Sequence, residues 1–174
     1  MKIRINKILN LIAITLLIVV ASFLDPFKEN YSTLSLSTKG YFLFLFLGIL
    51  IGLILSFETY YISNKKYAII MFLSLLVGTI IPHDISYNLQ GNLHLFNAYL
   101  GFSIMMIITF VNLYQSIMIK RQNKVPLYIV LIGLFISVYS YMNYLCVNTF
   151  SELIIIICVL VSHYLMSKEN LKKD

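Results

Sequence analysis

Long apolar stretches separated by short polar segments run through the whole chain of 174 residues. A helix needs about 20 mostly apolar residues to cross roughly 30 Å of hydrocarbon. Six stretches approach that length, and the third and the sixth need flanking residues to reach it. They are Ile8–Leu24, Tyr41–Phe57, Tyr67–Pro82, His94–Tyr114, Val125–Asn143 and Leu153–Met166, the last with Glu152 at its start. The pattern predicts an all-α fold, a polytopic bundle of six transmembrane helices that forms one integral membrane domain over residues 1–174.

The basic residues alternate between the two sides that six spans would create. Of the 13 lysines and arginines, 11 fall on one side, and Lys28 and Lys39 fall on the other. The larger set is Lys2, Arg4, Lys7, Lys65, Lys66, Lys120, Arg121, Lys124, Lys168, Lys172 and Lys173. Cytoplasmic loops carry the excess of Lys and Arg in membrane proteins. We therefore expect a multi-pass protein of the cell membrane with both termini in the cytoplasm.

The first span has a second interpretation. Basic residues followed by the apolar run Ile8–Val20 and by Val19-Val20-Ala21 before Ser22 resemble a signal peptide with a small-residue cleavage site. The apolar run continues through Leu24, which favours a retained helix. Both alternatives stay open at the level of the sequence, and the other five spans keep their orientation in either case.

Composition narrows the class of protein. Apolar residues make up 60% of the chain and charged residues 11%, against about half and about a quarter in ordinary soluble domains. These values exclude a disordered chain, a nucleic-acid-binding domain and a disulfide-stapled secreted module. We therefore assign the basic residues behind the formal charge of +6 to the ends of membrane helices, and we expect no nucleic-acid partner.

Candidate chemistry is concentrated between the third and fourth spans. Residues 81–99 hold two of the three histidines, one acid and several amides, with no lysine or arginine. An imidazole can act as a general base or hydrogen-bond donor near neutral pH, and an adjacent carboxylate can fix its tautomer. His83, Asp84 and His94, with Glu152 on the same side of the membrane, are the candidate catalytic residues. Glu152 has an equally supported structural role, because acids are favoured at helix N-termini.

Further polar residues extend this candidate site. Asn92, Asn97 and Asp25 are candidate ligand-binding residues on the same side, and the Ser- and Thr-rich loop Asp25–Gly40 is either a cap or a solvated connection. The cysteine and histidine spacing contains no metal motif, so no metal and no cofactor are expected. Glu58 closes the second span on the opposite side, where we expect it to pair with lysines or water.

Small residues mark two helix faces. Gly48 and Gly52 form a G-x-x-x-G motif that allows another helix to approach closely. Ala98 and Gly101 follow His94 at helical spacing and give a narrow face suited to burial. Packing within the chain is the favoured use of both faces, and homodimerisation through the glycines is the alternative.

One motif resembles a known family. Gly78-Thr79-Ile80-Ile81-Pro82-His83-Asp84, followed by Leu93-His94 and Ala98, is similar to a pattern in small bacterial six-helix proteins of unknown function, which resemble the Frag/DRAM/Sfk group. That group includes the damage-regulated autophagy modulators and the GPI-anchor remodelling proteins. Its last-span acid is usually followed by a basic residue, whereas Leu153 follows Glu152 here. A weaker resemblance is to the VanZ-like family, in which Leu-His-x-x-x-Ala-Tyr normally follows the first span.

The resemblance implies an outward-facing polar centre linked to lipid modification or membrane lipid organisation. We therefore expect the protein to bind or handle a membrane lipid, with a head group near His83, Asp84, His94 and Glu152. Two alternatives stay open. One is a structural or regulatory membrane subunit that forms a homo-oligomer or packs against a partner protein, and the other is a lipid-modifying acyl-transfer or hydrolytic enzyme.

Overall fold

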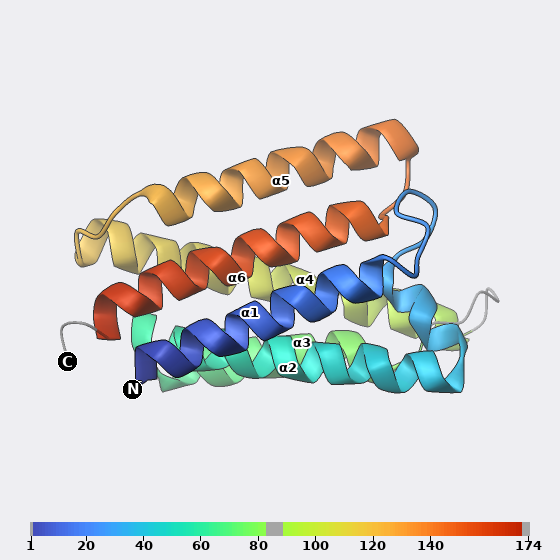
Figure 1. The fold of residues 1–174 in the computed structure, drawn as a ribbon, viewed down its shortest axis with the longest axis horizontal. Coiled ribbons are helices and arrows are strands. Elements are labelled where there is room, and N and C mark those ends of the chain that lie inside the picture. Colours follow the sequence, from blue (N-terminus) through green and yellow to red (C-terminus); the bar gives the residue numbers. More distant parts are fainter. Residues whose placement is uncertain (1, 83–88, 172–174) are drawn as a thin grey trace.

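Six α-helices lie side by side in the computed structural model, which describes residues 2–82 and 89–171 (Figure 1). They are α1 (Lys2–Ala21), α2 (Thr38–Ile62), α3 (Lys65–Ile80), α4 (Leu89–Tyr114), α5 (Val125–Tyr144) and α6 (Thr149–Leu171). A 3-10 helix, η1 (Tyr31–Leu36), precedes α2, and a π-helical turn, η2 (Gln115–Ile119), extends α4. The all-α class is confirmed.

Both termini lie at the same end of the bundle (Figure 1). We call this end the terminal end, and the end that carries the α1–α2 connection and the start of α6 the loop end. An even number of antiparallel helices places the termini together, as the alternation of basic residues requires. Which end faces the cytoplasm stays a prediction.

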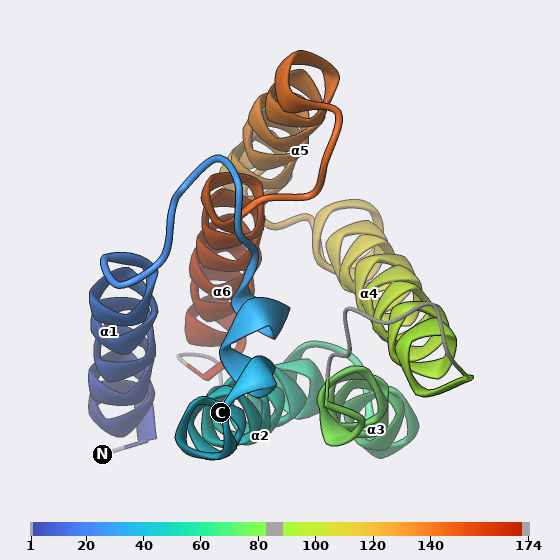
Figure 2. The same cartoon turned by 90° about the vertical axis from the view of Figure 1, so that its right-hand side faces the viewer.

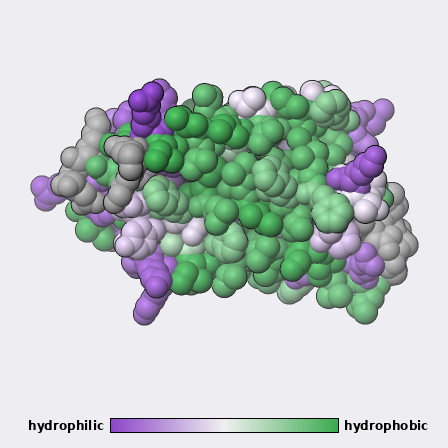
Figure 3. All heavy atoms as spheres, turned by 60° about the horizontal axis from the view of Figure 1, so that its bottom comes forward, coloured by the Kyte–Doolittle hydropathy of each residue, from purple (hydrophilic) through white to green (hydrophobic). Residues whose placement is uncertain are grey.

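Five of the helices in the described part of the chain are long and apolar enough to cross a membrane, with α4 and η2 counted as one continuous segment, Leu89–Ile119. Apolar side chains cover the middle of the face seen in Figure 3, and hydrophilic side chains gather at both ends. These features are those of a multi-pass membrane protein. The helix α3 has 16 residues, about 24 Å at 1.5 Å per residue, and is shorter than a full span.

The predicted spans and the observed helices differ mainly at their ends. The helix α5 agrees with its predicted span to within one residue, whereas α2 and α6 extend beyond theirs on both sides. Local capping explains where two of the helices begin. Ser37 accepts a hydrogen bond from the Gly40 N–H at the start of α2, and Asn64 accepts from Lys66 and Tyr67 at the start of α3. A polar N-cap can lie several residues outside the apolar run, so hydropathy alone places the ends imperfectly.

The helix α6 occupies the middle of the bundle. It contacts α1, α2 and α5, while α4 packs mainly against α3 (Figure 2). The predicted small-residue faces lie at contacts within the chain. A Cβ on Gly48 would collide with Thr79 of α3, and one on Gly52 would come within 3.2 Å of the Phe72 ring. A Cβ on Gly101 would collide with the carbonyl oxygen of Ser74, so α4 approaches α3 closely there.

Candidate functional site

Two adjoining cavities lie near the loop end of the bundle. The first, of about 180 Å³, lies between α3, α4 and α6 and has a polar edge formed by Asn30, Ser32, His94 and Glu152. The second, of about 320 Å³, lies between α4 and α5 against α6, and mostly apolar and aromatic side chains line it. Both cavities are lined by Ala98, Tyr99, Phe102, Val147 and Glu152. Both cavities are therefore mainly apolar, the first has a polar edge, and Glu152 lines both.

His94 is held in place by the end of α3. Its side chain is 1% exposed, and its Nδ1 lies 2.6 Å from the carbonyl oxygen of Ile81. Because a carbonyl oxygen only accepts, Nδ1 carries the proton and donates it in this hydrogen bond. The ring also packs against Phe44 of α2, with ring centroids 6.5 Å apart. The predicted candidate thus lies on the wall of the first cavity with a fixed ring orientation.

Glu152 connects α6 to the loop before α2. Its Oε2 accepts a hydrogen bond from the backbone N–H of Tyr31 at 2.7 Å. The Tyr31 hydroxyl in turn donates to the carbonyl oxygen of Leu17 at 2.7 Å. Burial raises the pKa of the Tyr31 phenol, and the neighbouring Glu152 carboxylate raises it further. The acid predicted for catalysis therefore also anchors the chain that covers the cavity.

Backbone groups complete this anchoring. The first N–H groups of a helix have no partner within the helix. At the start of α6, the Thr149 N–H donates to the carbonyl oxygen of Glu29 at 2.6 Å, and the Phe150 N–H donates to that of Pro26 at 3.0 Å. The loop is therefore docked on the N-terminus of α6, which agrees with the interpretation of the segment as a cap.

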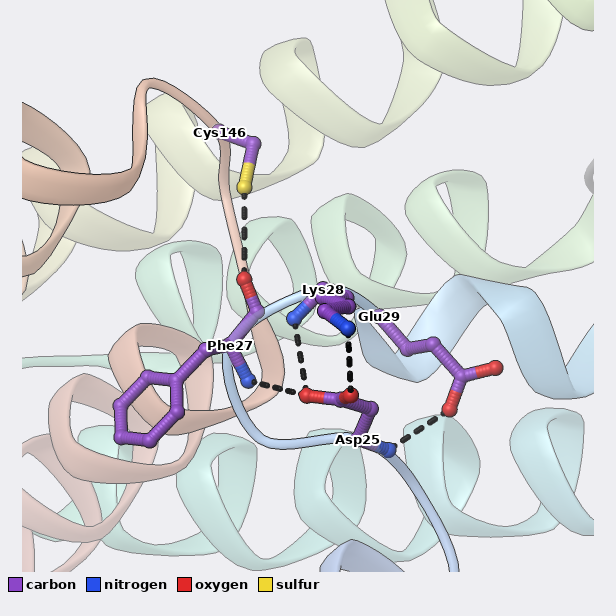
Figure 4. A network of polar contacts seen from close by, with 5 residues as sticks. All are labelled: Asp25, Phe27, Lys28, Glu29 and Cys146. Atoms are coloured by element: carbon purple, nitrogen blue, oxygen red, sulfur yellow. Dashed lines mark hydrogen bonds and ion pairs between the residues drawn. The ribbon is translucent and has the colours of Figure 1, made fainter.

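Asp25 belongs to that loop and does not line either cavity. Figure 4 shows its carboxylate accepting from the backbone N–H of Phe27 at 3.0 Å and of Lys28 at 3.2 Å, with the Lys28 ammonium 3.9 Å away. Its own N–H donates to Glu29 Oε2 at 2.7 Å, and the Cys146 thiol donates to the Phe27 carbonyl at 3.6 Å. Asp25 thus shapes the loop and has its carboxylate engaged there.

The other predicted site residues divide into three groups. Ala98 and Gly101 line the first cavity, whereas Asn92 and Asn97 do not line either cavity. His83 and Asp84 lie outside the described residues. Within residues 2–82 and 89–171, no three His, Cys, Asp or Glu side chains come together as a metal site.

A second polar region lies inside the bundle toward the terminal end, and sequence reasoning missed it. The Glu58 side chain is fully buried, and its Oε1 accepts hydrogen bonds from Asn6 Nδ2 at 2.9 Å and Asn10 Nδ2 at 2.8 Å. Asn6 Nδ2 also lies 3.2 Å from Ser167 Oγ of α6. We call Asn6, Asn10, Glu58 and Ser167 the Glu58 cluster. Glu58 was expected to pair with lysines or water, whereas its partners among the described residues are the two amides of α1, and no lysine is among them.

A second row of polar contacts runs beside this cluster. Asn112 of α4 donates to Thr59 Oγ1 at 3.1 Å and accepts from Ser63. Thr109, one turn earlier on α4, lies 3.2 Å from Nε2 of the buried His163 on α6. These residues occupy one or two positions per helix. A useful signal in the sequence would have been Asn6 and Asn10, two amides one turn apart within an apolar helix.

Comparison with known proteins finds no counterpart. No protein-family model, no curated protein and no solved structure matches the chain. The two polar regions are therefore the basis on which a function of this protein can be proposed.

Proposed function

We propose that this membrane protein binds a single membrane lipid at the loop end of the bundle. The acyl chain would lie in the second cavity between α4 and α5, and the head group would lie against the polar edge of the first cavity. The observation that carries the proposal is the adjoining pair of cavities, one apolar and one polar-edged, at a helix end. The proposal is in line with the resemblance to the Frag/DRAM/Sfk group, which is linked to lipid organisation. We also propose that the loop end lies on the extracytoplasmic side.

The second cavity suits an apolar ligand. Ligand pockets are mostly apolar, with a few placed polar groups, and range from about 300 to 1,000 Å³. Its wall includes Leu134 and Val138 of α5 and Phe102 of α4. Val138 is 54% exposed, so this wall also faces the region that lipid would occupy around the bundle. A chain could therefore enter from the side, between α4 and α5.

The polar edge favours a head group that donates hydrogen bonds. Among the described residues that line the two cavities, Glu152 is the sole acid and there is no lysine or arginine. Oε2 of Glu152 is engaged by Tyr31, which leaves Oε1 as the atom for a ligand. A carboxylate attracts an amine or a hydroxyl and repels a bare phosphate. An amine-bearing phospholipid therefore suits the edge better than an anionic one.

Native mass spectrometry of the protein in mild detergent with added phosphatidylethanolamine tests this proposal. Val138→Trp places a large ring in the second cavity and should reduce the bound lipid by about tenfold. Ile132→Trp is the matched control, since Ile132 is on the same helix, is 58% exposed and does not line the cavity. Equal lipid retention by wild type and Val138→Trp would overturn the proposal. Equal retention of phosphatidylglycerol and phosphatidylethanolamine would overturn the choice of head group.

A further inference from the structure

The Glu58 cluster contains oxygens without a partner. Both amide donors point to the same carboxylate oxygen, Oε1, and Glu58 Oε2 has no hydrogen-bond partner within the described chain. The side-chain oxygen of Asn10, a residue 5% exposed, is also buried and unpartnered there. Buried polar atoms are nearly always satisfied, so two such oxygens in one cluster are atoms to which a ligand could bind.

The charge balance points in the same direction. A carboxylate in the apolar interior of a membrane protein is costly unless it is paired. Arg4 and Lys7 of α1 are exposed, and the Lys120 ammonium binds the Ile62 carbonyl and Asn170 Oδ1. The sole ion pair recorded among the described residues joins Lys28 to Asp25 at the other end of the bundle. Among the described residues, Glu58 thus has neutral hydrogen-bond partners and no cationic one.

We propose that the Glu58 cluster is a binding site for a small monovalent cation, with Na⁺ as the ion that fits its chemistry. Hard cations take oxygen ligands, and the cluster offers the carboxylate, the side-chain oxygens of Asn6 and Asn10, and the Ser167 hydroxyl. A single carboxylate is neutralised by one positive charge, whereas a divalent ion would leave a net charge in the interior. A bound water would satisfy the two oxygens and leave the carboxylate charge unbalanced.

The position of the cluster makes ion binding structurally consequential. Glu58 lies four residues before the end of α2, which is about 6 Å along the helix. Its ligands come from α1, α2 and α6, so a bound ion would join three helices. Ion binding should therefore stabilise the folded bundle in proportion to ion occupancy.

Thermal unfolding in detergent at constant pH and ionic strength tests this site, with NaCl replacing choline chloride. The unfolding midpoint of the wild type should rise by at least about 3 °C in NaCl. Glu58→Gln should fold and lose the response to Na⁺. A glutamine removes the negative charge and places an amide donor beside the unpartnered oxygen of Asn10. Asn10→Ala keeps the carboxylate and should raise the Na⁺ concentration required by about tenfold. Asp25→Asn, a carboxylate variant at the other end that lines neither cavity, should respond as the wild type does.

The responses of the wild type and of Glu58→Gln to Na⁺ decide whether the Glu58 cluster binds the ion. A Na⁺-dependent rise in the wild type that is absent in Glu58→Gln supports the site. No Na⁺-dependent rise in the wild type overturns it. An equal rise in wild type and Glu58→Gln also overturns it, because the ion would then bind elsewhere. The lipid proposal is unaffected by any of these results, since its cavities lie at the other end.

Discussion

The two polar regions of this bundle are built in opposite ways. At the loop end, Glu152 and His94 bind backbone groups of neighbouring segments and lie on the wall of open cavities. Toward the terminal end, Glu58 is enclosed by side chains of other helices, and one of its oxygens has no recorded partner. The first region has cavities beside anchored side chains, whereas the second has two buried oxygens without a partner in the described chain. The cavities at the loop end favour an organic ligand, whereas the two unpartnered oxygens of the Glu58 cluster favour a small ion.

The difference also separates two kinds of stabilisation. Backbone partners at the loop end are present whatever the side chains of the loop are, so that region depends weakly on individual residues. The Glu58 cluster depends on two amides of α1, the helix that a signal-peptide interpretation would remove. Removal of the partners of a buried charge is far more costly than removal of a partner near solvent. We therefore expect substitutions in the Glu58 cluster to lower the free energy of unfolding more than substitutions at the loop end do.

The largest effect is expected from the double variant Asn6→Ala and Asn10→Ala. It removes both recorded donors of Glu58 and leaves a buried carboxylate without partners, which should lower the free energy of unfolding by about 3–5 kcal/mol. Denaturant unfolding in mixed micelles measures this loss. Asn143→Ala, which removes an exposed amide bound to the Tyr139 carbonyl, is the matched control and should change little. A loss equal to that of the control would show that the Glu58 cluster contributes no stability.

Much of the fold was accessible from the sequence, because a membrane requires long apolar helices and the hydropathy pattern shows them directly. The helix α5 shows this well, since its apolar run and its observed ends agree. The helix α3 shows the limit, because its 16 residues are shorter than a span and yet form a helix that packs against α2 and α4. Apolarity predicts that a segment is helical and leaves open whether it spans.

Candidate site residues were accessible where a local pattern marks them. His94 was proposed because it belongs to a polar segment between two spans, and Glu152 because it opens a helix. The Glu58 cluster was missed because tertiary packing alone brings Asn6 and Ser167 together, 161 positions apart. Asp25 shows the converse. It was a candidate ligand-binding residue, and its carboxylate accepts hydrogen bonds from the backbone of its own loop.

An intermediate effect is expected where α4 meets α3 beside the first cavity. A Cβ at Gly101 would collide with the backbone of Ser74, so Gly101→Ala should force the helices apart and cost about 1–3 kcal/mol. Gly78→Ala is the matched control, because its Cβ would find ordinary contacts of 3.7 Å or more. The same unfolding assay measures both. If the two alanines have equal effects, the close approach of α4 to α3 is not what fixes this wall of the cavity.

The smallest effect is expected at Glu152, and it is the most informative about the loop end. Glu152→Ala removes the acceptor of the Tyr31 N–H and should cost about 1–2 kcal/mol, with faster amide hydrogen exchange at Tyr31. Glu152→Gln keeps a side-chain acceptor and should restore slow exchange. Lys28→Ala is the control on the same loop, because its side chain is 84% exposed in an ion pair of 3.9 Å with Asp25, and its backbone N–H, which binds Asp25, is retained.

The two Glu152 variants separate anchoring from ligand binding. Slow exchange at Tyr31 combined with loss of phosphatidylethanolamine in Glu152→Gln would show that the carboxylate charge serves the lipid and that its hydrogen bond serves the loop. Retention of both would reduce Glu152 to an anchor and leave the head group to His94 and its neighbours. Fast exchange in Glu152→Gln would show that the charge itself holds the loop. In that case the loop end, like the Glu58 cluster, would depend on a carboxylate and not on backbone partners alone.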